Sequence, residues 1–379
     1  MRLPSSELEA LKAAGLGRTM RLLEERQGSQ VVADGKVLQS FASNDYLGFS
    51  QEPKIAQAMA EGLQIHGVGS AASRLVSGTF GPHKLLEEKI AASKQAEAAL
   101  VFSSGYATAL GCIPAIVGKG DYVIIDKLAH ACLIDACRLS GATLRVYPHQ
   151  HLDRLESLLS FVRGKFPTAR ILVVTESVFS MDGDVCKLLE TVELVERFDA
   201  MLWLDEAHGL GVFGERGMGL AEQENLQARI AFQMGTLSKS AGLSGGYVAA
   251  SQAWIDLFVH KARSFVYSTA PPPALAHAAC VAWDCMQSDM GRERRQMLRE
   301  RIQMMAQVAD VFSPIIPLVL GRNEAALEAS KLLEDAGFWV PAIRFPTVPH
   351  GKARLRISLS AVHPLPEIER LIPYLLGLR

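Results

Sequence analysis

Short apolar runs alternate with stretches of helical spacing through the middle of the chain. Apolar runs of this length are typical of buried strands, and the longer amphipathic stretches favour helices. The predicted strands occupy residues 98–102, 121–126, 143–147, 170–175 and 200–204, followed by 231–235 and 246–250. The predicted helices between them occupy residues 84–95, 105–116, 130–139 and 151–163. This alternation predicts an α/β domain with a mostly parallel seven-stranded sheet that carries helices on its faces.

The N-terminal segment has a different pattern. Residues 5–27 are predicted to be helical in two pieces, because Leu16, Met20 and Leu23 recur at helical spacing after the break at Gly15 and Gly17. Two further glycines, at positions 28 and 35, bracket a short segment that is predicted to form a hairpin.

The C-terminal segment changes character after Ala270–Pro273. A helical stretch over 275–312, interrupted or bent near Asp289–Gly291, carries the charge run Arg292–Arg295, which is interpreted as a solvated face. The predicted elements that follow are strand 315–320, helix 322–336, strands 338–343 and 353–359, and helix 365–376. The predicted organisation is an N-terminal helix and arm (1–48), a large α/β domain (49–285) and a small α+β C-terminal domain (286–379).

Composition narrows the class of protein. The 379 residues are 49% hydrophobic with a net charge of −1, which gives no electrostatic footprint for nucleic acid or an anionic membrane surface. No apolar run approaches the roughly 18 residues of a membrane span, and the polar N-terminus does not resemble a signal peptide. The six cysteines show neither a CxxC pair nor metal-ligand spacing. They are interpreted as reduced core residues of a cytoplasmic protein, without a metal site.

The segment 201–247 carries the clearest chemistry. Asp205 ends the apolar run 201–204, and Lys239 follows in a segment of small residues that includes Gly242, Gly245 and Gly246. Ligands of α/β sheets collect at the carboxyl ends of strands, where Asp205 is expected. A lysine with small neighbours can be approached by a flat ring, and a carboxylate can keep a pyridine nitrogen protonated. These residues predict a pyridoxal 5′-phosphate site, with Lys239 as the Schiff-base lysine.

Other interpretations of this segment were weighed. Alone, Lys239 is more often a surface lysine. The letters DEAH imitate a helicase box, but the chain has no GxxxxGK[ST] phosphate loop. Gly209, Gly211 and Gly214 spell a dinucleotide-binding GxGxxG, but the following residues 215–219 are too rich in glycine to open the required helix.

Several predicted strands end in polar or aromatic residues that would meet at one rim of the sheet. These residues are Ser104, His130, Ser180 and Asp205. The turn 102–106 precedes a predicted helix, whose N-terminus would suit a phosphate, and Tyr106 could flank a ring. His130 could stack on a flat ring, although a lone histidine there more often only begins a helix.

Two arginines in the C-terminal segment could bind a carboxylate. Arg354 and Arg356 alternate with apolar residues, so both are expected on one face of a strand. Arginine binds carboxylates in a bidentate manner, as an amino-acid substrate requires. The alternative is surface charge on an edge strand.

Taken in order, these motifs resemble the α-oxoamine synthases, a branch of the fold-type-I pyridoxal-phosphate enzymes. The motifs, which span nearly the whole chain, are SNDYLG, GSAASRLVSGT, FSSGY, DKLAHA, TESVFSMDGD, DEAHGLGVFGERG, GTLSK and PTVPHGKARLR. The chain departs from the usual pattern at Ala71 and Ala72, where paired glycines are common, at Ser238 and at Glu206. None of these departures removes a catalytic group.

The resemblance implies roles for individual residues. The implied catalytic residues are Lys239, His130, Asp205 and His208. The implied cofactor-binding residues are Gly105, Tyr106, His130, Ser180, Asp205, His208, Thr236 and Lys239, with Ser268 and Thr269 reaching the cofactor of a partner subunit. The implied substrate-binding residues are Arg21, Asn44, His130, Thr347 and Arg356. The resemblance also implies a homodimer with active sites at its interface.

Within the branch, the compact length and the segment AIRFPTVPHGKARLRISLSAVH most resemble the members that act in biotin biosynthesis. This resemblance implies condensation of L-alanine with a pimeloyl thioester, carried by CoA or a carrier protein. The alternative is glycine with a shorter acyl-CoA, as in glycine C-acetyltransferase (2-amino-3-ketobutyrate CoA ligase) or 5-aminolevulinate synthase. A non-catalytic scaffold on the same fold is a further alternative, which the presence of Lys239 disfavours.

Overall fold

The computed structural model describes residues 4–13 and 16–379 and divides into two compact units. Unit 1 comprises residues 1–44, 181–183 and 297–379, and unit 2 comprises residues 45–180 and 184–296. The division thus falls after Asn44, at both ends of a short loop, and within a helix. The domain boundaries proposed at residues 48 and 285 remain a prediction.

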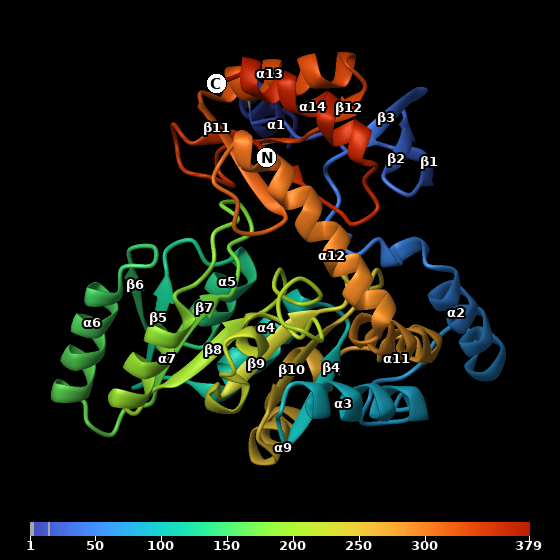
Figure 1. Cartoon of the computed structure of the whole chain (residues 1–379). Coiled ribbons are helices and arrows are strands. Elements are labelled where there is room, and N and C mark those ends of the chain that lie inside the picture. The colour runs from blue at the N-terminus through green and yellow to red at the C-terminus, as the bar shows by residue number, and fades with distance from the viewer. Residues whose placement is uncertain (1–3, 14–15) are drawn as a thin grey trace. The chain divides into compact units, whose positions relative to one another are not determined.

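Unit 2 is built on the predicted seven-stranded sheet, whose order is β4-β10-β9-β8-β7-β5-β6 (Figure 1). Its strands are β4 (Ala98–Phe102), β5 (Tyr122–Asp126), β6 (Thr143–Tyr147), β7 (Ile171–Glu176), β8 (Met201–Asp205), β9 (Phe232–Thr236) and β10 (Gly246–Ala250). Neighbouring strands pair in parallel except at β10, which is antiparallel to both β9 and β4. The carboxyl ends of the other strands therefore lie along one edge, as the sequence predicts.

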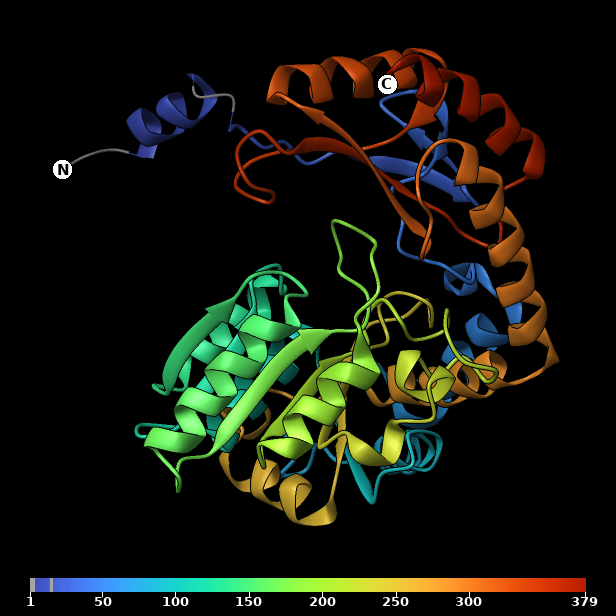
Figure 2. The ribbon, with the colours of Figure 1, turned by 60° about the vertical axis from the view of Figure 1, so that its left-hand side comes forward.

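Helices cover both faces of this sheet (Figure 2). They are α2 (Pro53–His66), α3 (Gly81–Ser93), α4 (Gly105–Ile116), α5 (Ala131–Leu139), α6 (Leu152–Lys165), α7 (Leu188–Arg197), α8 (Leu220–Gln223), α9 (Gln252–Lys261), α10 (Arg263–Val266) and α11 (Pro273–Gln287), with 3-10 turns η1 (Phe49–Gln51) and η2 (Gln227–Arg229). Most of the strands and helices predicted over 84–250 agree with the structure within a few residues.

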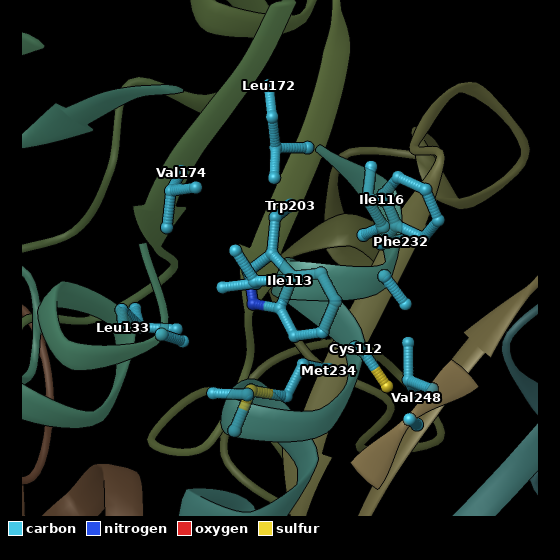
Figure 3. Packing of buried hydrophobic residues seen from close by; sticks show 14 of the residues in the cluster. Cys112, Ile113, Ile116, Leu133, Leu172, Val174, Trp203, Phe232, Met234 and Val248 are labelled. Carbon is cyan, nitrogen blue, oxygen red and sulfur yellow. The ribbon is translucent and has the colours of Figure 1, made fainter. Parts of the chain in front are cut away.

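Strand residues alternate between two apolar cores. Val174 and Trp203 belong to the core under α4, α5 and α9, whereas their neighbours Val173 and Leu202 belong to the core under α6 and α7. Figure 3 shows Trp203 surrounded by side chains from the sheet and helices of the first core. Both faces of a parallel strand are buried, which is why these strands are continuous apolar runs in the sequence.

Unit 1 contains two smaller sheets. The strands β1 (Leu23–Gln27), β2 (Gln30–Ala33) and β3 (Lys36–Ser40) form an antiparallel meander, to which β12 (Phe338–Trp339) adds in parallel. The second sheet has the order β11-β14-β13, from β11 (Ile315–Gly321), β13 (Ala342–Ile343) and β14 (Ala353–Ser358). The remaining elements of unit 1 are α1 (Pro4–Ala13), η3 (Met305–Gln307), α13 (Asn323–Asp335) and α14 (Leu365–Gly377). The helix α12 (Asp289–Met304) is divided between the units after Gln296, so Arg295 belongs to unit 2.

Three sequence predictions are wrong. The second helical piece before residue 27 is an irregular stretch followed by strand β1, and the side chain of Met20 is fully exposed, so its helical spacing reflects no buried face. The helical break predicted at Gly15 lies outside the described residues. The strand predicted at 338–343 is two short strands in different sheets, β12 and β13, separated by Val340 and Pro341.

The third correction concerns the charge run of α12, which is not uniformly solvated. Arg295 is only 2% exposed, and its guanidinium donates to the carbonyl oxygens of Met286 and Glu215. An added Cβ at Gly217 would lie 2.6 Å from the same guanidinium. The arginine therefore anchors the glycine-rich loop of unit 2 instead of facing water.

Candidate active site

Asp205 and Lys239 lie in one electrostatic cluster at the carboxyl edge of the unit 2 sheet. Asp205 is the last residue of β8 and is 4% exposed; its Oδ1 accepts a hydrogen bond of 2.8 Å from the amide of Ala207. Burial raises the pKa of Asp205, while the nearby Lys239, the Ala207 amide and His130 oppose that rise. A buried carboxylate in this position favours a cationic partner, which is what a protonated pyridine nitrogen would be.

Lys239 is half-buried in the connection between β9 and β10. This connection folds back through bonds from the Gly242 amide to the Lys239 carbonyl and from the Thr236 hydroxyl to the Gly245 carbonyl, at 2.9 and 2.7 Å. The glycines here permit close backbone contacts. Gly242 has φ +70° and an added Cβ would lie 2.3 Å from the Ser50 amide, so a side chain cannot be accommodated without rearrangement.

His130 caps helix α5, as predicted, and lies close enough to Asp205 and Lys239 for both charges to affect its pKa. Burial lowers the pKa of His130, and its Nδ1 accepts from the Cys132 amide at 3.3 Å, both of which favour the neutral ring. Its own amide donates to the Glu176 carboxylate at the end of β7. The loop before α5 therefore fixes an uncharged imidazole at the sheet edge.

His208 follows Asp205 in a loop that contains several glycines. Its Nδ1 lies 2.6 Å from the hydroxyl of Tyr46, and both residues are buried. The neighbouring Glu206 accepts from the amides of Leu220 and Ala221 at the start of α8. An added Cβ at Gly209 or Gly219 would lie within 2.4 Å of the Glu206 carboxylate. Gly209 is thus required by packing against Glu206, and an added Cβ at Gly211 or Gly214 would meet Ser240 or Glu222, so packing accounts for the misleading GxGxxG pattern.

The turn between β4 and α4 has the form of an anion site. Ser104 caps the 12-residue helix α4, its Oγ accepting from the Ala107 amide at 3.1 Å, and Gly105 lies against Met234 and Thr236. Gly246 lets β10 approach, because an added Cβ would lie 2.5 Å from the Gly105 nitrogen. Amides at a helix N-terminus bind phosphate well, so this turn fits the phosphate of the expected cofactor.

The structure places the remaining cofactor residues of the sequence analysis in unit 2. Ser180 is buried in the loop after β7, and Thr236 ends β9. Tyr106 is half-exposed and donates to Asp135. Thr269 pairs with Ser73 by an isolated β-bridge, beside Ser268.

In unit 1 the structure brings Arg356 and Asn44 together. Arg356 is 5% exposed, and one guanidinium nitrogen donates to the Asn44 side chain at 3.1 Å and to Ser358 at 2.6 Å. Arg354, on the same face of β14, binds Asp182 and the Met181 carbonyl at 2.6 and 3.0 Å. The two arginines are therefore buried, and the alternative of surface charge on an edge strand is wrong.

The other two predicted substrate residues have different surroundings. Arg21 pairs with Glu334 at 2.8 Å and with Asp34 at 3.0 Å. Thr347 lies exposed in the turn after Arg344, to whose carbonyl its amide donates. Their roles at a substrate stay predictions.

Three residues of the edge were not singled out from the sequence. Tyr46 lies within the motif SNDYLG and touches His208, Glu176 holds the His130 amide, and His149 lies between two aspartates. The pKa of Glu176 lies well above its ordinary value, mainly because the carboxyl group is buried and also because it lies near the charge of Asp205. Tyr46 and Glu176 had a signal in the sequence, because they lie within the motifs SNDYLG and TESVFSMDGD, whereas His149 lies in none of the quoted motifs.

Comparisons with known proteins identify the family of the chain. The aminotransferase class I and II family matches residues 37–375. The chain is 43% identical over 376 residues to the 8-amino-7-oxononanoate synthase of Geobacter sulfurreducens, covering 97% of this chain and 95% of that one. It is 44% identical to the enzyme of the same name from Citrifermentans bemidjiense, covering 96% and 95%.

Solved structures show the same fold. Sphingomonas wittichii serine palmitoyltransferase is 29% identical with a TM-score of 0.91, covering 99% of this chain and 96% of that one. The 8-amino-7-oxononanoate synthase of Francisella tularensis is 25% identical with a TM-score of 0.77, covering 90% and 97%. A third match, at a TM-score of 0.91, is described as SPT with PLP. The chain therefore belongs to the aminotransferase class I and II family and, within its fold-type-I pyridoxal-phosphate-dependent enzymes, to the 8-amino-7-oxononanoate synthases, which are acyltransferases of biotin biosynthesis.

Proposed function

We propose that the protein condenses L-alanine with the thioester of pimeloyl-CoA, or of a pimeloyl carrier protein, to give 8-amino-7-oxononanoate, carbon dioxide and the free thiol. The observation that carries this proposal is the clustering of Lys239, Asp205 and His130 at the carboxyl edge of the sheet. A scaffold protein would have no use for a half-buried lysine beside a buried carboxylate and a neutral histidine.

The residues present fit pyridoxal phosphate. When bound, this cofactor withdraws electrons from the α-carbon of an amino acid, which makes the α-proton removable. Lys239 is assigned to hold the cofactor covalently through Nζ and Asp205 to stabilise its protonated ring nitrogen. The other assigned cofactor residues are Gly105, Tyr106, His130, Ser180, His208 and Thr236.

Proton transfer is assigned to Lys239. The lysine Nζ would remove the α-proton of alanine and later return a proton to the product. A base positioned in this way contributes roughly 10²–10⁴-fold to the rate. His130, whose pKa is lowered by burial, would pack against the cofactor ring as a neutral side chain, without adding a competing positive charge.

Substrate recognition is assigned to residues of unit 1. The guanidinium of Arg356, already aligned by Asn44 and Ser358, suits the carboxylate of alanine, because charge-assisted bonds of arginine to carboxylates are strong and directional. Arg21 and Thr347 are assigned to the substrate as further contacts.

We also propose a homodimer in which Ser268 and Thr269 contact the cofactor phosphate of the partner subunit. Near them, unit 2 exposes Tyr267 (73%), and the segment that contains Ser73 exposes Val76 (81%). Apolar side chains so exposed favour burial in an interface. Val76→Asp is expected to sediment as a monomer and to release thiol more slowly than the wild-type protein. Leu189→Asp on α7 should leave the dimer intact. A wild-type monomer with full activity would contradict this proposal.

A cytoplasmic location is proposed from the cysteines. All six are free and buried, as a reducing compartment permits. None of the described helices is long and apolar enough to cross a membrane. Cell fractionation that placed the protein in a soluble periplasmic fraction would contradict the assignment.

The test of the activity is thiol release by purified protein with pyridoxal phosphate and pimeloyl-CoA, with alanine, glycine or serine in parallel. Release with alanine alone is expected. Lys239→Ala should abolish it, while the exposed Lys119→Ala is the matched control. Preference for glycine with acetyl- or succinyl-CoA would instead indicate another α-oxoamine synthase, and turnover by Lys239→Ala would overturn the assignment of the lysine.

A further inference from the structure

His149, which follows β6, is enclosed by two carboxylates. Its Nδ1 lies 2.9 Å from an oxygen of Asp126 and its Nε2 lies 2.6 Å from an oxygen of Asp184. Its ring also forms a T-shaped pair with that of Phe179, with the ring centroids 4.3 Å apart and the ring planes at 84°. The histidine therefore joins the loop after β5 to the loop after β7.

Both ring nitrogens must donate, because an ionised carboxylate only accepts hydrogen bonds. The arrangement thus requires the doubly protonated imidazolium. Burial alone would lower the pKa of His149, but the hydrogen bonds to Asp126 and Asp184 raise it to about 10. The neighbouring Gln150 completes the arrangement, its amide donating to Asp126 at 2.9 Å and its side chain to Asp184 at 2.6 Å.

Each aspartate also shapes its own loop. Asp126 accepts from the Leu128 amide at 2.8 Å, and its carbonyl accepts from the Ala129 amide at 3.1 Å, which fixes the segment that leads to His130. The Asp184 carbonyl accepts from the Phe179 amide at 3.1 Å, which closes the loop that contains Ser180. His149 is the charged group common to the two loops.

The cluster does not have the arrangement of a metal site. Among the residues that the structure describes, no group of three or more His, Cys, Asp or Glu side chains could hold a metal ion. Each aspartate already accepts bonds from other groups, which leaves His149 as a link in a hydrogen-bonded chain.

We propose that His149 is a positioning residue of the active site: as an imidazolium it holds the loop of His130 and the loop of Ser180 in a fixed relation, and so sets how both residues meet the cofactor. This inference rests on the proposed function, since it is the cofactor that His130 and Ser180 are assigned to contact. His149 itself touches neither cofactor nor substrate in this role.

The charge of His149 can be tested directly in the holoenzyme. Long-range ¹H–¹⁵N correlation spectra distinguish a doubly protonated imidazole from either neutral tautomer. We expect His149 to show both nitrogens protonated at pH 8, where an ordinary histidine is neutral. A neutral ring at pH 8 would overturn the inference, whatever the enzyme's activity.

The positioning role is tested with His149→Gln, which keeps the size and polarity but loses the charge. The matched control is His260→Gln, an exposed histidine on α9. We expect weaker pyridoxal-phosphate binding and a lower kcat, each by roughly 10- to 100-fold, the usual cost of removing a group that orients a ligand-binding residue. The KM for alanine should change less than twofold, because its carboxylate is assigned to Arg356, and the visible circular dichroism of the bound cofactor should weaken.

A second variant distinguishes loss of positioning from misfolding of His149→Gln. Asp184→Asn keeps the imidazole but removes one carboxylate, so the pKa of His149 should fall and cofactor binding should weaken less than in His149→Gln. If both variants match His260→Gln in cofactor binding, circular dichroism and kcat, the inference fails while the proposed function stands. If wild-type protein neither binds the cofactor nor releases thiol, the proposed function fails instead.

Discussion

The strands of the seven-stranded sheet bury carboxylates, whereas those of the β11-β14-β13 sheet bury guanidinium groups. Unit 2 places carboxylates at the ends of three neighbouring parallel strands: Asp126 on β5, Glu176 on β7 and Asp205 on β8. Unit 1 buries two guanidinium groups on one strand, those of Arg354 and Arg356 on β14. In unit 2 the groups come from different strands, whereas in unit 1 one strand supplies both.

The difference follows from how each sheet is built. A parallel sheet aligns the carboxyl ends of its strands, so one polar residue at each end is enough to assemble a cluster. An antiparallel strand has no such shared end, and its side chains meet because alternate residues share a face. The acidic cluster therefore depends on topology, and the basic pair depends on the two-residue period of one strand.

The largest expected effect comes from removing the Asp205 carboxylate from the acidic cluster. Asp205→Asn should lower kcat for thiol release by roughly 10²–10³-fold, the range for losing a preorganised charge in an active site. Steady-state thiol assays measure it, with the exposed Asp199→Asn as control. An Asp205→Asn enzyme with unchanged kcat would show that the buried carboxylate has no catalytic role.

The two arginines of unit 1 should behave differently from one another. Arg356→Met should raise the KM for alanine about 10- to 150-fold, since a charge-assisted bond contributes roughly 1.5–3 kcal/mol. Arg354→Met should instead lower the free energy of unfolding, because it leaves Asp182 without its partner at 2.6 Å. Kinetics and urea unfolding of both variants separate the roles; equal changes in KM would remove the distinction.

The two units also differ in how a histidine of each should make stability depend on pH. His363 in unit 1 accepts from the Ser360 amide at Nδ1 and lies 2.7 Å from the Ser40 carbonyl at Nε2, which fits a neutral ring. Burial lowers the pKa of His363 to about 4. The unfolded chain, with a pKa near 6.5, binds a proton that the folded protein does not. Stability from this residue is therefore present above about pH 6.5 and is lost as the pH falls through about 4.

Urea unfolding at pH 7 and pH 5 measures this effect, which we expect to be about 2 kcal/mol at most between those values. His363→Gln should be less stable at pH 7 but should lose this part of the pH dependence. His149 has the opposite sign: its stabilisation is present below about pH 6.5 and is lost as the pH rises through about 10. A pH dependence unchanged by His363→Gln would place the titrating group elsewhere.

The smallest expected effect is on the free energy of unfolding and comes from relieving backbone strain at an uncharged residue, Ala71. Ala71 has φ +53°, in the left-handed region that glycine adopts at no cost, and it occupies a position where related sequences are expected to have glycine. Ala71→Gly should raise the free energy of unfolding by about 1 kcal/mol. Ala91→Gly, within helix α3, is the contrasting control and should be destabilising. A destabilised Ala71→Gly would mean that the alanine methyl group contributes packing that outweighs the strain.

The sequence predicted unit 2 better than unit 1 for a physical reason. Parallel strands buried on both faces are continuous apolar runs, so β4 to β10 could be recognised from local pattern alone. In unit 1 the buried strand β14 was also predicted, but β12 and β13 have only two residues each. Strand β1 pairs with β2 but has no buried residue, and a helical spacing of apolar residues was mistaken for a helix.

The residues of the site could likewise be predicted only where a local motif marks them. Asp205, His130 and Lys239 stand next to strand ends or within recognisable motifs, and the structure brings them together. The pairing of His149 with Asp126 and Asp184 joins three loops, and no local pattern encodes it. The same holds for Arg295, whose partners at Met286 and Glu215 are set by tertiary packing.

Trp203 gives the protein a built-in optical reporter. Its indole is fully buried in an apolar core, two residues before Asp205 on the same strand, so its fluorescence should be shifted to short wavelength. A pyridoxal chromophore held at Asp205 and Lys239 would absorb in the region of this emission. Energy transfer from Trp203 should therefore quench the native fluorescence as cofactor binds, and the emission of the purified protein becomes a direct measure of its cofactor content.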